Sequence, residues 1–242
     1  MTTIVSSFYS NVNKRTDRNF DNYVNYGTVL LKAKINKIIF TDEEMYKTIN
    51  QYENENTKFI LTNKEDIYLY KYLNILDNFK VNTTSPLKDT LEYIFIMCNK
   101  TEVVRKAIEL NYFNTENFIW LDFGIRHVFK NNSDEEFIKK IENLNDKIYS
   151  KVRIASIWSP SISYNVDIYK NVAWYFAGGV FGGNKEFLLD FANKTKEKCI
   201  HIIEKQNTIM WEVNIWFLIY LENKDLFDYY SCDHNNTIID NY

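Results

Sequence analysis

The feature that most constrains the fold is a series of short apolar runs in the first half of the chain, separated by segments with helical spacing. The runs are TIVSSF at 3–8, KIIFT at 37–41, KFILT at 58–62 and NFIWL at 117–121. β-Branched and aromatic residues bounded by polar ones are typical of strands. Strands that alternate with helices predict an α/β fold with a mostly parallel sheet and helices on both faces. The continuous apolarity of the runs agrees, because parallel strands are buried on both sides.

Between these runs, apolar residues recur at the spacing of amphipathic helices. The first such segment is Asp17–Lys32, and a short helix reaching about Tyr52 follows the second run. The pattern at 67–76 predicts another helix. The segment 91–110 predicts either one long helix or two consecutive ones.

The pattern changes after Asp122. We expect, in chain order, a helix near Ser133–Tyr149, strands at 152–157 and 171–176, a glycine-rich turn at 178–183, a helix from Asn184, a helix over Ile209–Tyr220 and a strand at 227–231. No internal repeat or linker divides the chain, so we expect one domain over 1–242.

Composition excludes several classes of protein. The chain has 242 residues, 45% of them hydrophobic and 25% charged, which is ordinary for a globular domain. The net charge of −3 gives no basic footprint, so we expect no nucleic-acid partner. No run reaches the ~18 apolar residues of a membrane span. The N-terminus lacks the pattern of a signal peptide, so we expect a soluble, cytoplasmic protein without a transmembrane segment. Three scattered cysteines predict neither a disulfide framework nor a zinc ribbon.

The excess of Asn, Lys, Ile and Tyr has a simple explanation in the source genome. All four residues can use A/T-rich codons, so we expect an A/T-rich genome rather than a binding function behind this bias.

Asp122 is the strongest single candidate for chemistry. It follows FIWL directly, so it should lie at the carboxyl end of a buried central strand, where ligands bind in sheets of this kind. A buried carboxylate needs a partner, and a divalent cation is one, since hard cations prefer oxygen ligands. The alternative is an Asp that caps the next turn or pairs with Arg126. Gly124 removes side-chain bulk beside this carboxylate.

Four of the six glycines lie within 178–183. Backbone without Cβ lets a ligand approach closely, and a helix that begins at Asn184 would offer free N–H groups to an anion. The spacing matches neither the dinucleotide-binding motif nor the P-loop. The alternative is a tight connection between a strand and a helix, with Asn184 as the N-cap.

Glu212 lies at the rim of an apolar helix stripe, between aromatic residues. A carboxylate in such surroundings could have a raised pKa and serve as a general base. The alternative is a polar boundary residue of an amphipathic helix. His127, five residues after Asp122, and the pair Asp233–His234 near the end of the chain are further candidates, although an isolated His is more often a surface residue.

Few arginines occur in this chain, and four basic residues could meet a diphosphate. They are Arg15, Arg18, Lys100 and Arg105. Arg binds phosphate in a bidentate manner, whereas a solvated helix face is the alternative for at least half of the group.

A resemblance extends over nearly the whole chain. The segments TIVSSFY, NKIIFTDEE, KTEVVRKAI, NFIWLDFGIRH, FAGGVFGGNKEF, WEVNIW and YYSCDHN follow in this order. They resemble the HtrL/YibB-type proteins and, through them, the nucleotide-sugar glycosyltransferases of the GT-A fold. The resemblance implies a GT-A-like, Rossmann-like domain, with a nucleotide-binding half at 1–122 and a sugar- and acceptor-binding half at 123–242. It also implies a UDP- or GDP-linked sugar donor, a glycan or protein acceptor, and Mn²⁺ or Mg²⁺.

The resemblance also assigns roles to residues. Ser6, Ser7, Phe8 and Tyr9 would border the nucleoside, and Gly178, Gly179 and Gly182 would line the crevice for sugar and acceptor. Asp122 would begin the D-x-D metal motif, Glu212 would match the acidic residue after the glycine-rich helix, and His234 a C-terminal metal-binding His.

The motif at Asp122 departs from the family pattern. Position 124 is Gly, not Asp, so His234, Asp233 or His127 would have to complete a metal site. If transfer inverts the sugar, Glu212 would act as the base; if the configuration is retained, it would only position the sugar.

Two other functions compete with transfer of a sugar. The incomplete motif and the 17% of aromatic residues favour a catalytically silent nucleotide-sugar or glycan-binding protein of the same fold. A methyltransferase would want a glycine-rich turn after the first strand, and TIVSSFYSNVNKR has none.

Overall fold

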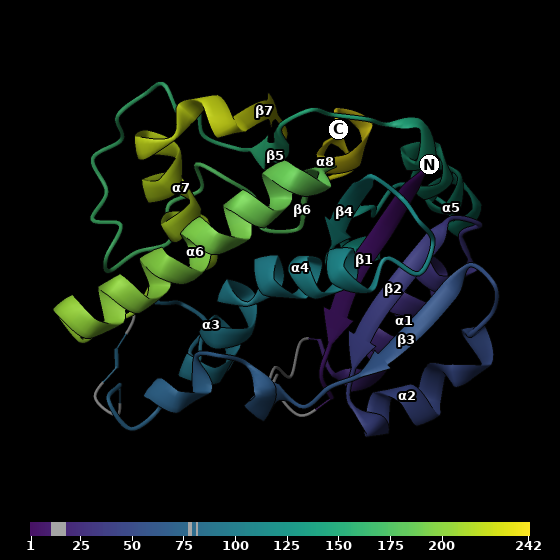
Figure 1. Ribbon diagram of the computed structural model, residues 1–242, viewed down its shortest axis with the longest axis horizontal. Coiled ribbons are helices and arrows are strands. Elements are labelled where there is room, and N and C mark those ends of the chain that lie inside the picture. Colours follow the sequence, from purple (N-terminus) through teal and green to yellow (C-terminus); the bar gives the residue numbers. More distant parts are fainter. Residues whose placement is uncertain (11–17, 77–78, 81) are drawn as a thin grey trace.

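A computed structural model of the chain describes residues 1–10, 18–76, 79–80 and 82–242. In this part of the chain, seven strands form one sheet in the order β3-β2-β1-β4-β6-β5-β7 (Figure 1). The strands are β1 (Thr2–Phe8), β2 (Asn36–Thr41), β3 (Thr57–Leu61), β4 (Asn117–Leu121), β5 (Val152–Ser156), β6 (Val180–Asn184) and β7 (Phe227–Ser231). Only β6 is antiparallel to its neighbours among these strands, so the sheet is mostly parallel as predicted.

Helices cover both faces of the sheet. They are α1 (Phe20–Lys32), α2 (Glu43–Ile49), α3 (Leu91–Cys98), α4 (Lys100–Leu110), α5 (Asp134–Glu142), α6 (Lys185–Gln206), α7 (Glu212–Glu222) and α8 (Thr237–Asp240). The apolar sides of α3, α4, α6 and α7 share one core with the sheet, and α1, α2, α5 and α8 pack on the opposite face. Figure 1 shows α4 and α6 passing across the near side of the strands.

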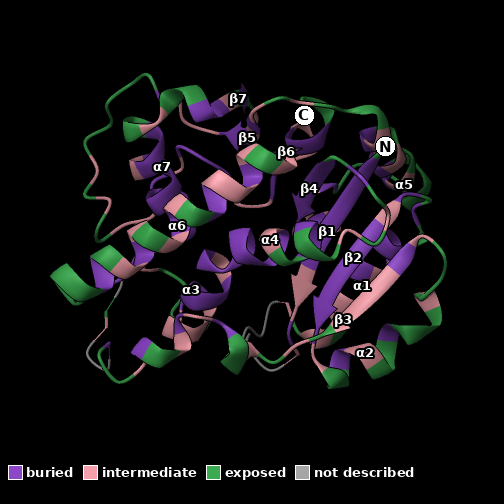
Figure 2. Cartoon of the chain, viewed as in Figure 1, coloured by how far each residue is buried: buried purple, intermediate pink, exposed green. Residues whose placement is uncertain are grey.

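The alternation of side chains along β4 explains why this strand is apolar from Phe118 to Leu121. Phe118 and Trp120 join the core under α4 and α6, whereas Ile119 and Leu121 join the core under α1 and α5. All five residues of the strand are buried. Successive residues of a strand point to opposite faces, so a central strand with helices on both sides favours apolar residues at successive positions. Figure 2 shows this buried centre and the exposed outer sides of the helices.

Two predicted elements are wrong. The segment 67–76 forms a chain of tight turns rather than a helix, with backbone bonds such as Tyr70 N to Ile67 O at 2.9 Å. Its apolar spacing arises because Leu69 and Leu76 insert into the core from successive turns. The predicted strand at 171–176 is irregular, and no strand partner satisfies its Ala173 N–H, which donates to Oδ1 of Asn214 at 2.8 Å.

Other boundaries differ from the predictions in smaller ways. The segment 91–110 forms two helices, separated at Asn99. The helix expected to start at Asp17 begins at Phe20, and Asp17 itself lies outside the described residues. The helix near Ser133–Tyr149 ends at Glu142 and continues as a 3-10 turn to Asp146.

The glycine-rich segment is not one turn, because its second half is strand β6. Gly182 and Gly183 lie inside the sheet, where Gly183 pairs with Phe118 of β4. A Cβ at Gly182 would lie 2.6 Å from the carbonyl oxygen of Phe118. The backbone at Gly183 has φ +147°, which is strained for any residue with a side chain.

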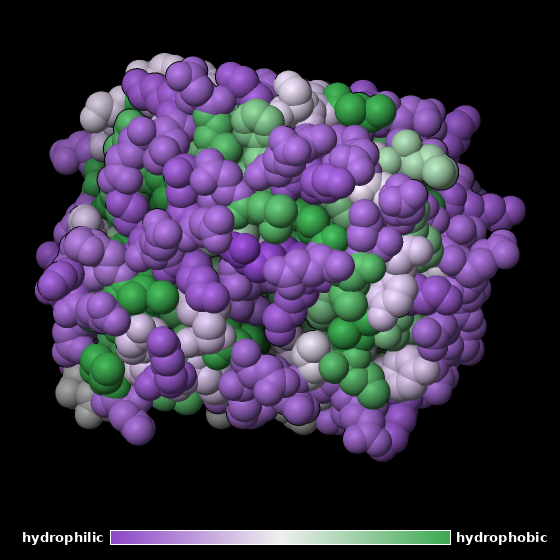
Figure 3. Space-filling view, in the orientation of Figure 1, coloured by the Kyte–Doolittle hydropathy of each residue, from purple (hydrophilic) through white to green (hydrophobic). Residues whose placement is uncertain are grey.

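The face of the molecule seen in Figure 1 is mainly polar. Figure 3 shows hydrophilic residues over most of the face seen in Figure 1, with apolar residues visible between them. Among the described residues, no helix combines the length and apolarity that crossing a membrane requires.

Candidate active site

A pocket opens at the carboxyl ends of β1 and β4. The chain runs from β1 outward to β2 and β3, and only then returns to form β4 on the other side of β1. Such a switch point leaves a crevice beyond the strand ends, which is where α/β sheets bind ligands. A cavity of about 310 Å³ lies here, and Ser7, Phe8 and Tyr9 from the end of β1 line it together with Trp120 and Asp122 from the end of β4.

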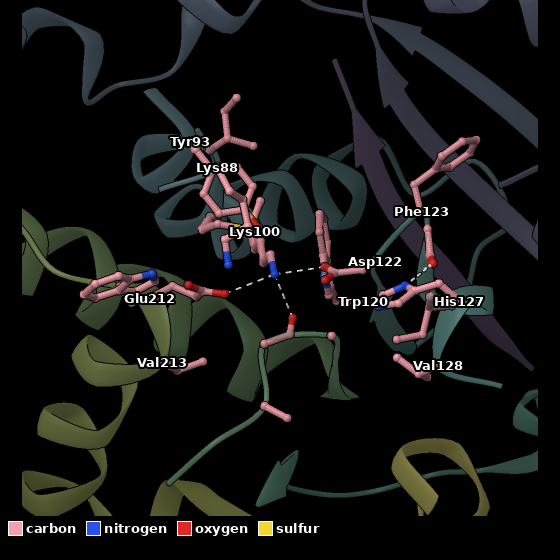
Figure 4. A pocket seen from close by; sticks show the side chains of 18 of the residues that line it. Lys88, Tyr93, Lys100, Trp120, Asp122, Phe123, His127, Val128, Glu212 and Val213 are labelled. Carbon is pink, nitrogen blue, oxygen red and sulfur yellow. Dashed lines mark hydrogen bonds and ion pairs between the residues drawn. The ribbon is translucent and has the colours of Figure 1, made fainter. Parts of the chain in front are cut away.

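The ammonium of Lys100 forms the centre of the pocket. This side chain is only 1% exposed. Its Nζ lies 2.9 Å from Oδ1 of Asp122, 3.1 Å from Oε1 of Glu212 and 2.9 Å from the carbonyl oxygen of Gly178 (Figure 4). A lysine has three N–H donors, and each finds an oxygen acceptor here. Lys100 therefore joins α4, the end of β4, the segment before β6 and α7 at one point.

Charge balance keeps Lys100 protonated. Burial alone would lower the pKa of this amine, but attraction and hydrogen bonds from Asp122 and Glu212 outweigh it, so the pKa of Lys100 is raised above its usual value. Glu212 is the first residue of α7, where the helix dipole favours a negative charge. Two carboxylates face a single ammonium, so this group of three has a net negative charge.

Asp122 points into the pocket rather than into the next turn. Trp120 Nε1 donates a hydrogen bond to Oδ1 of Asp122 at 2.8 Å, so this oxygen accepts from both Trp120 and Lys100. Arg126 pairs with Asp134 instead, at 2.8 Å, which removes the alternative partner. In the described part of the chain, Oδ2 of Asp122 and Oε2 of Glu212 have no hydrogen bond. Each acid thus keeps one oxygen for a ligand.

Gly178 and Gly179 border the pocket. A Cβ at Gly178 would lie 2.2 Å from Oε1 of Glu212, and one at Gly179 would lie 2.9 Å from Cδ1 of Ile125. The absence of a side chain at 178 therefore lets Glu212 reach Lys100. Gly182 lies in β6 and does not line the pocket.

Two histidines lie at the wall of the pocket. His127 Nδ1 is 2.7 Å from the carbonyl oxygen of Gly124. The ring of His234 stands edge-on to Trp174 with centroids 4.6 Å apart. Although the residue as a whole is exposed, desolvation of the ring lowers the pKa of His234. Asp233 is exposed and is not in the lining, and its Oδ1 accepts the backbone N–H of His234 at 2.7 Å.

Not all predicted residues meet here. Ser6 is buried within β1 and lies outside the lining. Arg105 bonds to Oε1 of Glu102 at 2.9 Å and to Asn193 at 2.6 Å, away from the pocket. Arg18 does line the pocket, whereas Arg15 lies outside the described residues.

Lys88 and Tyr93 are pocket residues that the sequence analysis missed. Lys88 precedes α3, forms an ion pair with Asp89 at 3.1 Å and lies 5.5 Å from the ring centroid of Tyr93. Figure 4 shows Lys88 and Tyr93 on the same side of the pocket, next to Lys100. Trp174 and Trp211 were missed as well. No motif marks these residues, since Tyr93 lies in α3 and the other three lie in irregular segments, which only the tertiary structure brings to the strand ends.

The residues present do not fit a divalent cation well. Within the described ranges, no group of three or more His, Cys, Asp or Glu side chains comes together as a metal site. Position 124 is Gly, and Oδ1 of Asp122 is already bonded to an ammonium and an indole N–H. A metal at that oxygen would have to displace Lys100, which would leave a buried charge without partners.

Comparison with protein families gives one match over most of the chain. A family model described as "Bacterial protein of unknown function (HtrL_YibB)" matches residues 2–237. Among curated proteins, no match is found.

Solved structures with a similar layout include three enzymes. A 4-diphosphocytidyl-2C-methyl-D-erythritol synthase from Anaerococcus prevotii matches with 10% identity and a TM-score of 0.43, over 96% of this chain and 86% of that one. A CMP:2-keto-3-deoxy-manno-octonic acid synthetase complexed with CTP matches with 8% identity and a TM-score of 0.47, over 96% and 89%. A glycosyltransferase involved in glycosylation of the major capsid of PBCV-1 matches with 14% identity and a TM-score of 0.42, over 95% and 82%. At these scores the likenesses bear on neither activity nor substrate.

Proposed function

We propose that the chain, which belongs to the HtrL/YibB family, is a glycosyltransferase that moves a sugar from a UDP- or GDP-linked donor to a glycan or protein acceptor. One observation carries the proposal: the carboxylates of Asp122 and Glu212 are held by Lys100 in a pocket at the switch point between β1 and β4. The two acids suit the hydroxyl groups of a sugar, and the anionic part of the donor would lie toward Arg18 and Lys88 elsewhere in the lining.

The nucleoside has an aromatic wall available at the end of β1. The ring of Phe8 lies 5.2 Å from that of Tyr23 and 5.6 Å from that of Phe123. Aromatic side chains in this position can stack on a flat base. Lys88 and Arg18, which also line the pocket, supply the positive charge that a diphosphate needs.

In the proposed reaction, Oδ2 of Asp122 accepts a hydrogen bond from a hydroxyl group of the donor sugar. Oε2 of Glu212 takes the proton from the acceptor hydroxyl. The acceptor oxygen bonds to the anomeric carbon as the bond from that carbon to the diphosphate breaks. The diphosphate leaves with the electron pair, and positive side chains stabilise its developing charge. With Glu212 as the base, attack comes from the side opposite the diphosphate and the product has inverted configuration.

Calorimetry with UDP- and GDP-linked sugars tests donor binding. We expect the natural chain to bind one of these donors and Asp122→Asn to bind it about tenfold or more weakly, since a lost charge-assisted hydrogen bond costs ~1.5–3 kcal/mol. Asp134→Asn is the matched control, because Asp134 is an exposed acid outside the lining and should leave affinity unchanged. Equal affinity of Asp122→Asn and the natural chain would contradict the proposal.

Turnover separates the enzyme from a silent binding protein. We expect slow hydrolysis or transfer of the bound donor, with Glu212→Gln lowering kcat by ~10²–10⁴ while donor affinity stays the same. NMR of the product should show inversion. Tight donor binding with neither hydrolysis nor transfer to any acceptor would favour the binding protein, a reading that the bonding of Lys100 to both acids supports.

A further inference from the structure

The oxygen atoms around Lys100 form the kind of set that a hard metal ion uses. Two carboxylate oxygens and one carbonyl oxygen surround its Nζ at 2.9, 3.1 and 2.9 Å. Mg²⁺, Mn²⁺ and Ca²⁺ prefer carboxylate and carbonyl oxygen ligands. In this chain an ammonium occupies their centre, and the side chain that supplies it is 1% exposed.

We propose that Lys100 is the built-in cation of the site, so that ligand binding needs no divalent metal. The ammonium neutralises one of the two acids and fixes the orientation of both. It acts through Asp122 and Glu212 and is therefore a positioning residue. The part of this proposal that concerns the donor rests on the proposed function; the part that concerns metal binding by the ligand-free protein does not.

The packing around Lys100 makes exchange for a metal unfavourable. The ammonium cannot leave toward solvent without breaking three contacts, and a buried charge that loses its partners is strongly destabilising. The indole N–H of Trp120 holds the same Asp122 oxygen at 2.8 Å, and this hydrogen bond would be lost if a metal took over that oxygen. The backbone also adapts to this arrangement, because only glycine at 178 leaves room for the Glu212 carboxylate beside Lys100.

Removal of the ammonium should create a metal site. In Lys100→Met, an uncharged side chain of similar length replaces the lysine, and the oxygens of Asp122, Glu212 and Gly178 lose their common donor. We expect Mn²⁺, followed by electron paramagnetic resonance of the free ion, to bind Lys100→Met saturably and not the natural chain. Mn²⁺ should also raise the melting temperature of the variant only, because a ligand that binds the folded state stabilises it.

Lys106→Met is the matched control, since Lys106 is exposed on the same helix α4 and lies outside the pocket. It should behave like the natural chain. A folded Lys100→Met that neither binds Mn²⁺ nor is stabilised by it would overturn the proposal. So would saturable Mn²⁺ binding by the natural chain that Asp122→Asn abolishes, and this measurement stands even if Lys100→Met does not fold.

Donor binding provides a second, separate test of the proposal. We expect the affinity of the natural chain for its nucleotide-sugar to change by less than about twofold between EDTA and Mn²⁺, or ~0.4 kcal/mol. Binding that appears only with Mn²⁺ would overturn the role of Lys100 and leave the proposed glycosyltransferase intact. Failure of every donor to bind would count against the glycosyltransferase, and the Mn²⁺ titrations of the ligand-free proteins would still decide the inference.

Discussion

Gly178 shows at the scale of one residue how little free space surrounds the charged centre. A Cβ there would lie 2.2 Å from Oε1 of Glu212 and 3.2 Å from Nζ of Lys100. Gly178→Ala should therefore push Glu212 away from Lys100. We expect a loss of about 1–3 kcal/mol in the free energy of unfolding, as for other overpacked sites. Donor binding should also weaken, because the added methyl group takes up space in the pocket that Gly178 lines. Urea unfolding and calorimetry measure the two effects.

Gly179→Ala provides the comparison for this substitution. Its added Cβ would meet Cδ1 of Ile125 at 2.9 Å, the end of a flexible side chain, and would lie 3.9 Å from Oδ2 of Asp122. A smaller effect is expected there. If Gly178→Ala kept the stability and affinity of the natural chain, the close approach of Glu212 would not matter as argued.

Lys37 makes a second prediction at the residue scale, outside the pocket. Burial lowers the pKa of this amine to about 8, although Glu142 opposes the shift. Between about pH 8 and 10.5 the unfolded chain therefore holds a proton that the folded chain lacks, so the free energy of unfolding rises with pH in this window. From pH 7 to 9.5 we expect a rise of about 2 kcal/mol relative to Lys37→Met, at 1.36 kcal/mol for each pKa unit.

Urea unfolding of both proteins at a series of pH values checks this expectation. Thiols such as that of the half-buried Cys232, whose pKa is raised by desolvation to about 12, lower stability as pH rises. They do so in both proteins and cancel in the difference. If the difference in the free energy of unfolding between the two proteins did not change with pH, the pKa of Lys37 would not be lowered in the folded state. Part of the effect of the substitution, the lost bond from Nζ to the carbonyl oxygen of Ile35 at 2.9 Å, should be independent of pH.

At the scale of elements, the packing of strand β6 explains why position 183, which lies outside the pocket, is also a glycine. Gly183 has φ +147°, and a Cβ there would lie 2.2 Å from the carbonyl oxygen of Lys151. We expect Gly183→Ala to cost at least ~1–3 kcal/mol in the free energy of unfolding, because the backbone is strained for any other residue. The folded fraction should bind the donor normally, since this position lies outside the lining. If Gly183→Ala had the same free energy of unfolding as the natural chain, the argument from backbone strain would be wrong.

Elements with a strong local pattern agree closely with prediction, and others do not. Strands β1 to β4 and helices α6 and α7 were predictable, since the strands are short apolar runs and the helices have apolar residues at helical spacing. The segments 67–76 and 171–176 show apolar periodicity too, yet they form turns and an irregular stretch. There the residues are apolar because the core covers them, and periodicity alone does not distinguish this cause from regular structure.

At the scale of the whole molecule, the two halves of the chain depend on each other. The ring of Trp120 in β4 stacks on that of Phe181 in β6, with centroids 6.2 Å apart, and β6 pairs along the whole of β4. A fragment of residues 1–122 would expose this strand edge and would leave Lys100 without Glu212. We expect the fragment to show no cooperative thermal transition by circular dichroism and no donor binding. A cooperative transition would show that the first half folds alone.

The sequence by itself determined the alternation of strands and helices and the position of Asp122 at a strand end. Both follow from local periodicity and from the polar residue that closes each buried run. Asp122, Glu212 and the glycines could therefore be singled out as candidates, but their relationship could not.

Only the tertiary structure decided which of these groups meet. Lys100 reaches Gly178 and Glu212, which lie 78 and 112 residues further along the chain. The tertiary structure also separates the glycines, since it places Gly178 beside Glu212 and Gly183 inside the sheet. Contacts over such separations depend on how α4 and α7 pack against the sheet, and that packing results from the whole core rather than from any local pattern.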